Sequence, residues 1–153
     1  MKYLNEISDT VDIINIYLNN IRIPSLWQNH FLMIDELSNE AYLKFCTKKT
    51  SDNTIPLEII FDSTELTINV GDITEVFCFK LDFIKNNRVV LEEILSCIFK
   101  SYIFMEYSRF YLTRMIFFNT CGMEVKRISL FRYFHLNYKK NQLYHPIYNI
   151  STF

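Results

Sequence analysis

The sequence predicts an α+β domain in which an antiparallel sheet, made of a meander and a C-terminal hairpin, packs against two helices. Three observations favour this fold class. Apolar residues recur every three or four positions near the N-terminus, they alternate with polar residues over residues 57–81, and only 2 Gly and 3 Pro interrupt the chain. A chain of 153 residues can bury roughly two-thirds of its unfolded surface. We therefore expect residues 1–153 to form a single domain.

Two segments have the pattern of a helix. Over residues 3–20 an apolar stripe recurs at helical spacing, and Asn20 offers a stop. The second helix is expected over residues 88–107, with Asn86 and Asn87 as caps. Its inner side would hold Leu91, Ile94, Leu95, Ile98, Tyr102 and Met105.

The clearest strand pattern covers residues 57–81. Apolar and polar residues alternate on both sides of Ser63-Thr64, which predicts a tight turn there, and Gly71-Asp72 predicts a second turn. The resulting register pairs Leu57 with Val70, Ile59 with Ile68, and Phe61 with Leu66. This three-stranded meander has one misfit, because the register places Glu75 opposite Ile68. A longer turn or a β-bulge would remove that conflict.

Two further hairpins are expected. The segment 26–37 contains an apolar run at residues 31–34 that is too short for its period to be measured, and we assign the segment to a strand that pairs with residues 41–47. Residues 110–119 and 123–134 are rich in aromatic and β-branched side chains and predict a hairpin around Gly122. A helix over residues 123–134 is the alternative.

Charge is distributed unevenly along the chain. Residues 1–84 carry six Lys/Arg against thirteen Asp/Glu, and residues 85–153 carry ten against four, although the net charge is only -1. This asymmetry predicts either an acidic face for a basic partner or two halves that attract each other within the fold.

The sequence also favours a cytosolic location. Glu6 and Asp9 precede any apolar run, so no secretory signal is predicted, and no uncharged apolar stretch approaches the roughly 18 residues of a membrane span. The cysteines are widely separated, and we expect free thiols rather than disulfides or a metal site. They are Cys46, Cys78, Cys97 and Cys121.

No catalytic, metal-binding or cofactor-binding residues are predicted. The three histidines lie on different predicted elements and lack a second ligand at metal-binding spacing: His30, His135 and His145. Nothing near Cys121 would activate its thiol as a nucleophile, and two isolated glycines cannot form a phosphate-binding loop. We therefore expect a binding protein rather than an enzyme.

Basic and aromatic residues alternate in the C-terminal third, which is one arrangement that binds nucleic acid. The basic residues are Lys126, Arg127, Arg132, Lys139 and Lys140, and the aromatic residues are Phe131, Tyr133, Phe134 and Tyr138. The net charge near zero favours the simpler interpretation, in which the aromatic side chains are the buried side of a strand. A nucleic-acid-binding or regulatory module is therefore the alternative function.

Acidic residues of the meander form the predicted partner-binding site. They are Glu58, Asp62, Glu65 and Asp72. The first three project to the polar face of the meander, and Asp62 would stand directly across from Glu65, where like charges are destabilising. A conflict with no folding benefit is typical of a functional site. We predict a negative patch for a Lys/Arg-rich partner, and a solvated turn is the alternative interpretation.

The segments Leu-Glu-Ile-Ile-Phe-Asp (57–62) and Leu-Thr-Ile-Asn-Val-Gly-Asp-Ile-Thr-Glu-Val-Phe (66–77), followed by the helix at 88–107 and a hairpin, resemble bacterial immunity proteins of contact-dependent growth inhibition systems. Members of that family tend to carry an aromatic residue and a histidine after the glycine, where this chain has Ile73 and Thr74; Gly71 and Phe77 fit the pattern. The resemblance covers about 50 of the 153 residues. It implies a small cytosolic α+β domain that neutralises a cognate toxin domain, often a nuclease, by direct binding and without catalysis.

Overall fold

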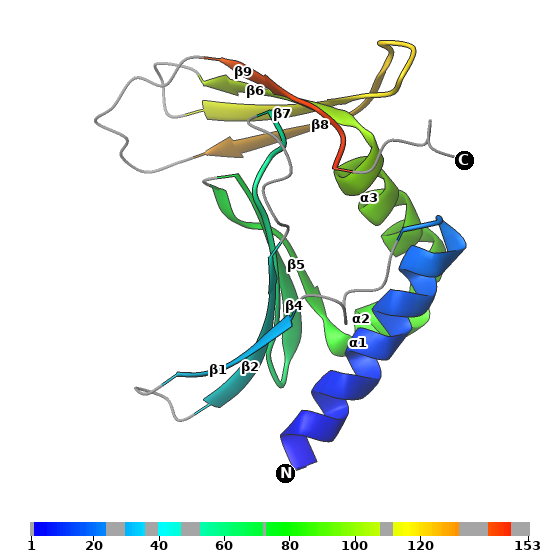
Figure 1. Cartoon of the computed structure of the whole chain (residues 1–153), viewed down its shortest axis with the longest axis vertical. Coiled ribbons are helices and arrows are strands. Elements are labelled where there is room, and N and C mark those ends of the chain that lie inside the picture. Colours follow the sequence, from blue (N-terminus) through cyan, green and yellow to red (C-terminus); the bar gives the residue numbers. More distant parts are fainter. Residues whose placement is uncertain are drawn as a thin grey trace. The chain divides into compact units, whose positions relative to one another are not determined.

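The structure is a computed structural model that describes residues 2–23, 30–35, 40–46, 53–71, 73–107, 112–131 and 141–147 (Figure 1). The chain divides into two compact units. The first comprises residues 1–49 and 56–93, and the second comprises residues 50–55 and 94–153. Both helices and antiparallel strands are present, which confirms the α+β class. The single domain stays a prediction.

The N-terminal helix α1 (Lys2–Asn20) forms as its apolar period predicts. The side chains of its stripe are fully buried, namely Ile7, Val11, Ile14 and Leu18. The helix ends with Arg22 in the left-handed conformation (φ 61°), where the Ile23 N–H donates to the Leu18 carbonyl at 2.8 Å. This is the Schellman arrangement, which satisfies carbonyls at the end of a helix.

The first unit contains a five-stranded antiparallel sheet in the order β1-β2-β3-β4-β5. The strands are β1 (His30–Asp35), β2 (Glu40–Cys46), β3 (Leu57–Phe61), β4 (Glu65–Val70) and β5 (Ile73–Lys80). The predicted hairpin of β1 and β2 is therefore confirmed, and it joins the meander through the pairing of β2 with β3.

The meander has the predicted register. β3 and β4 pair Leu57 with Val70, Ile59 with Ile68 and Phe61 with Leu66, and all six side chains are at most 2% exposed. A β-bulge interrupts the pairing of β4 with β5, so Phe77 rather than Glu75 lies opposite Ile68. The predicted conflict is thereby removed, because an apolar residue takes the place next to the core.

The second predicted helix is shorter than expected, which corrects the range 88–107. The chain forms α2 (Leu81–Asn86), α3 (Arg88–Lys100) and then the strand β6 (Tyr102–Tyr107). In β6 buried and half-buried residues alternate, as in a strand. Because the segment is apolar in nearly every direction, its sequence does not distinguish a period of two from a period of 3.6.

The asparagines between the helices also act differently from the predicted caps. The side-chain amide of Asn86 donates to the Asp82 carbonyl at 2.8 Å, and that of Asn87 donates to the Phe83 carbonyl at 3.0 Å. Both side chains therefore bond the end of α2 instead of the start of α3.

The second unit contains a four-stranded antiparallel sheet in the order β8-β7-β6-β9. Besides β6, its strands are β7 (Leu112–Phe118), β8 (Glu124–Phe131) and β9 (Gln142–Tyr144). The pairing of β7 with β8 confirms the predicted C-terminal hairpin. The meander and this hairpin belong to two sheets, whereas the sequence analysis placed them in one.

Candidate functional site

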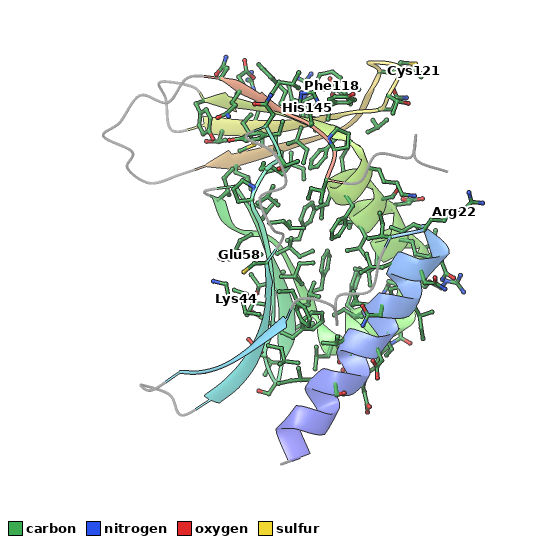
Figure 2. The ribbon with its side chains drawn as sticks, in the orientation of Figure 1. Arg22, Lys44, Glu58, Phe118, Cys121 and His145 are labelled. Carbon is green, nitrogen blue, oxygen red and sulfur yellow. The ribbon has the colours of Figure 1, made fainter. Side chains whose placement is uncertain are left out.

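The first sheet has one face whose side chains are half-buried or exposed, and we call it the open face. Residues paired across neighbouring strands share a face, so the register assigns its members. They are Lys44, Cys46, Glu58, Ile60, Glu65, Thr67, Asn69, Cys78 and Lys80. Figure 2 shows Lys44 and Glu58 on the side of the sheet away from α1. Three of the four predicted site residues lie on this face or at its edge: Glu58, Asp62 and Glu65.

Glu58 lies on β3 between two partners. Its carboxylate forms an ion pair with the Lys44 ammonium at 2.7 Å and accepts a hydrogen bond from the Asn69 amide at 3.2 Å. The hydrogen bond from Lys44 lowers the pKa of the Glu58 carboxyl, partial burial opposes that change, and Asn69 adds to it. Glu58 is therefore a fixed carboxylate with its charge already paired.

Glu65 and Lys80 form a second cross-strand pair. The Lys80 ammonium bonds the Glu65 carboxylate at 3.1 Å, and this hydrogen bond raises the pKa of Lys80, with the charge of Glu65 adding to the effect. The Lys80 side chain is 75% exposed, so the pair is strongly screened by water.

Asp62 closes the turn between β3 and β4. One of its carboxylate oxygens, Oδ1, accepts from the Thr64 N–H at 2.6 Å, the Thr64 hydroxyl at 2.8 Å and the Glu65 N–H at 2.8 Å. This is an Asx turn, in which a short side chain bonds the backbone two or three residues ahead. Asp62 therefore stabilises the turn between β3 and β4. Its other carboxylate oxygen, Oδ2, takes no part in these three bonds.

The expected repulsion between Asp62 and Glu65 is resolved by these separate bonds. The two residues are opposite each other, since the Asp62 N–H donates to the Glu65 carbonyl at 3.1 Å, but each carboxylate has its own donors. The fourth predicted residue, Asp72, lies outside the described residues. Around the turn the open face thus carries three carboxylates and two ammonium groups, which makes it less acidic than the sequence predicts.

Groups that could catalyse a reaction are scattered among the described residues. In that part of the chain no three His, Cys, Asp or Glu side chains gather as a metal site would require. Cys121 is exposed in the turn after β7, and His135 lies outside the described residues. His145 packs its ring against Tyr102 at a centroid distance of 5.4 Å.

The basic residues of the alternative function are described only in part. Lys126 and Arg127 lie on β8, and Arg127 donates two hydrogen bonds to the Glu124 carboxylate, at 3.0 and 2.6 Å. The other three basic residues of that set, and three of its four aromatic residues, lie outside the described residues. For nucleic-acid binding, the described residues therefore supply the Arg127 guanidinium, which is already paired with Glu124, and the Lys126 ammonium.

Sequence analysis missed an aromatic groove on the sheet of the second unit. The groove has a volume of about 460 Å³ and is open to solvent. It is lined by Tyr102, Phe104, Phe118, Asn119, Thr120, Gly122 and Leu143. Figure 2 shows Phe118 on this sheet. The cross-strand pairs Tyr102 with Phe118 and Phe104 with Leu143 build its floor, and the helix predicted over residues 102–107 hid this arrangement.

The fold and these surfaces define an α+β protein with two antiparallel sheets. No helix in the described ranges combines the length and the apolar character that crossing a membrane requires. Comparisons with protein families, with curated proteins and with solved structures find no significant match to this chain.

Proposed function

We propose that this chain is a cytosolic immunity protein that binds a cognate bacterial toxin domain, such as a nuclease, and neutralises it by covering its active or substrate-binding surface. The chain would act by binding alone, without catalysis or a cofactor. The order of strands and turns over residues 57–80, which contain the segments on which the family resemblance rests, supports this class.

The observation that carries the proposal is the paired charge on the open face. A partner that covers an unpaired carboxylate must compensate it, because an isolated buried charge costs several kcal/mol. Glu58 and Glu65 already have their cations, so a partner can cover them without leaving either charge alone. Their fixed positions also reduce the side-chain ordering that binding requires.

Asp62 is the residue of this face that would select a basic partner. Its Oδ1 atom holds the turn, while Oδ2 would accept a hydrogen bond from a partner's Lys or Arg. A charge-assisted hydrogen bond at this point would contribute about 1.5–3 kcal/mol to binding. Of the three described carboxylates of the predicted acidic patch, one would thus serve the partner and two are paired within the sheet.

The test uses the purified chain and the toxin domain encoded beside it. We expect binding, and loss of toxin activity on mixing. Asp62→Asn keeps an oxygen for the turn but removes the charge, and we expect it to weaken binding roughly tenfold, as loss of about 1.5 kcal/mol implies. The change should appear in titration calorimetry with little change in the melting temperature.

The matched control is Glu93→Gln, which removes the same charge from an exposed position on α3 and should leave the affinity unchanged. Absence of any binding by the wild-type chain would remove the proposed function. Equal affinities for the Asp62→Asn variant and the wild type would remove only the role of Asp62. Salt-sensitive retention on nucleic acid, without toxin binding, would favour the alternative function.

A further inference from the structure

β5 forms one edge of the five-stranded sheet, and the hydrogen-bond pattern shows which of its backbone groups face away from β4. The Asp62 N–H bonds the Glu65 carbonyl and the Gly71 N–H bonds the Pro56 carbonyl, so alternate residues of β4 starting at Glu65 bond β3. The Leu81 N–H bonds the Thr64 carbonyl at 3.2 Å, so the intervening residues of β4 bond β5.

This alternation divides the backbone groups of β5 into two sets. Phe77 and Phe79, opposite Ile68 and Leu66, direct their N–H and C=O groups to β4. The groups of Val76, Cys78 and Lys80 therefore point out of the sheet, two residues apart. Among the described residues, none of these outward groups has a backbone partner beyond the sheet, apart from the Lys80 carbonyl at the start of α2.

An aromatic row lies beside these outward-facing backbone groups. The ring centroids of Phe77 and Phe79 are 6.1 Å apart with an interplanar angle of 15°, and those of Phe79 and Phe83 are 5.6 Å apart at 8°. Phe77 and Phe79 are half-buried on the apolar side of the sheet, and Phe83 is 38% exposed. Each ring thus presents part of its surface at the open edge.

We infer that β5 accepts an extended segment of the toxin as a sixth strand of this sheet. The inference rests on the proposed function and names the element of the toxin that this edge would bind. Outward-facing N–H and C=O groups at every second residue match an extended polypeptide, whose own groups repeat at the same spacing. No headgroup, metal or compact ligand offers that series of donors and acceptors.

The neighbouring side chains of β5 also determine which side chains fit on the added strand. Because side chains alternate across a sheet, every second one would lie beside Phe77 and Phe79, where apolar residues fit. The remaining ones would lie on the open face beside Cys78 and the paired Lys80 and Glu65. The segment that fits is therefore an extended strand with apolar residues at alternate positions and small or polar residues between them.

Amide hydrogen exchange, resolved by residue with NMR, tests the inference directly. In the free chain we expect the Val76, Cys78 and Lys80 amides to exchange fast and the Phe77 and Phe79 amides to exchange slowly. In the complex with the toxin domain encoded beside the chain, all five should exchange slowly.

Two variants at Cys78 test whether its outward N–H bonds the toxin, through their effect on binding affinity. Cys78→Pro removes an outward N–H and breaks no bond to β4, so it is compatible with an edge strand. We expect it to weaken toxin binding at least about tenfold, while Cys78→Ser keeps the N–H and should bind as the wild type does. Melting temperatures report whether both variants fold, and the exchange measurement decides the question if Cys78→Pro does not fold.

The outcomes separate the two proposals. Toxin binding that leaves the Val76, Cys78 and Lys80 amides in fast exchange overturns the added strand and leaves the proposed function intact. A wild-type chain that does not bind the toxin overturns both. Protection of these amides in the free chain, with a dimeric mass by light scattering, would show that a second copy occupies the edge and would also overturn the inference.

Discussion

Arg22 is the residue with the least favourable backbone conformation among the described non-glycine residues. Its positive φ places the chain for the bond from Ile23 to Leu18 that closes α1. Figure 2 shows Arg22 at this end of the helix. Residues with a Cβ atom lose about 1–2 kcal/mol in this region of φ and ψ, and glycine does not. The sequence marked the end of the helix by its asparagines, but a positive φ at an arginine has no sequence signal.

We expect Arg22→Gly to stabilise the chain by about 0.5–1 kcal/mol, because relief of the backbone strain exceeds the added entropy of glycine in the unfolded state. For a chain of this length that raises the melting temperature by roughly 1–4 °C. Arg22→Ala is the control, since it removes the guanidinium but keeps the strain. A variant Arg22→Gly that melts at or below the wild-type temperature would show that the arginine side chain itself stabilises the helix end.

Glu58 links stability to pH. Its pKa is lower in the folded chain than in the unfolded chain, so the stabilisation by Lys44 and Asn69 is complete above the ordinary carboxyl pKa of 4.5. It is lost as the pH falls through the lower pKa of the folded state. We expect Glu58→Gln to reduce the free energy of unfolding by a few tenths to about 1 kcal/mol at pH 7.

Urea unfolding of the wild type and of Glu58→Gln, measured from pH 7 into acid, checks this linkage. The two midpoints should differ at neutral pH and converge once Glu58 is protonated. The same comparison with Glu93→Gln supplies the control, because that exposed residue forms no ion pair with another described residue. A difference that persists in strong acid would mean that the Glu58→Gln substitution disturbs the packing of the sheet rather than its charge.

At the scale of elements, local pattern determined the parts of the fold that have one apolar face. α1 and the pairing of β3 with β4 followed directly from a period of 3.6 and a period of two. The strand β6 could not be predicted from its period. It lies between β7 and β9, is apolar on both faces and therefore resembles a buried helix in sequence. The helix α2 was missed because six residues are too few to establish a period.

The aromatic row of Phe77, Phe79 and Phe83 couples β5 to α2 and gives a prediction for that junction. Phe83→Ala removes a stacked ring that is 38% exposed, and we expect a loss of about 1–2 kcal/mol in stability. The melting temperature should fall by several degrees. Val89→Ala, at a position that is 67% exposed, should change stability by less than about 0.5 kcal/mol. Equal effects at both positions would contradict a structural role for the row.

For the whole molecule, the separation of charge coincides with the division into units. The first unit contains eight Lys/Arg and fourteen Asp/Glu, and the second contains eight and three. The sequence therefore revealed where charge is concentrated along the chain. It could not reveal that Glu58 and Glu65 are paired, because Lys44 and Lys80 become their neighbours only through the strand register. The sequence analysis therefore placed Glu58 and Glu65 on one face of the sheet but did not predict the ion pairs that offset their charges.

The reactivity of the four free thiols can measure solvent access in both units. Cys46 and Cys78 lie in the first unit, and Cys97 and Cys121 lie in the second. Cys121 and Cys78 are exposed, and burial raises the pKa of both Cys46 and Cys78, with Glu65 adding to the effect at Cys78. Because the thiolate is the reactive form, we expect brief alkylation near neutral pH to modify Cys121 first and Cys78 next.

Mass spectrometry of peptides after short exposure to iodoacetamide gives this order. The half-buried Cys46 and Cys97 should react last, and all four should react at similar rates in the unfolded chain. Early modification of Cys97 or Cys46 would show that the corresponding unit opens in solution.

The bulge between β4 and β5 has a consequence for how this protein can change over generations. Between its two flanking pairs, Val70 with Ile73 and Ile68 with Phe77, β5 uses two more residues than β4. An even excess keeps Ile73 and Phe77 on the same side of the sheet, whereas an odd excess would turn one of them around. We therefore expect this strand to tolerate insertions and deletions of two residues better than those of one, because a change of two residues keeps the core side chains of β5 on the same face of the sheet.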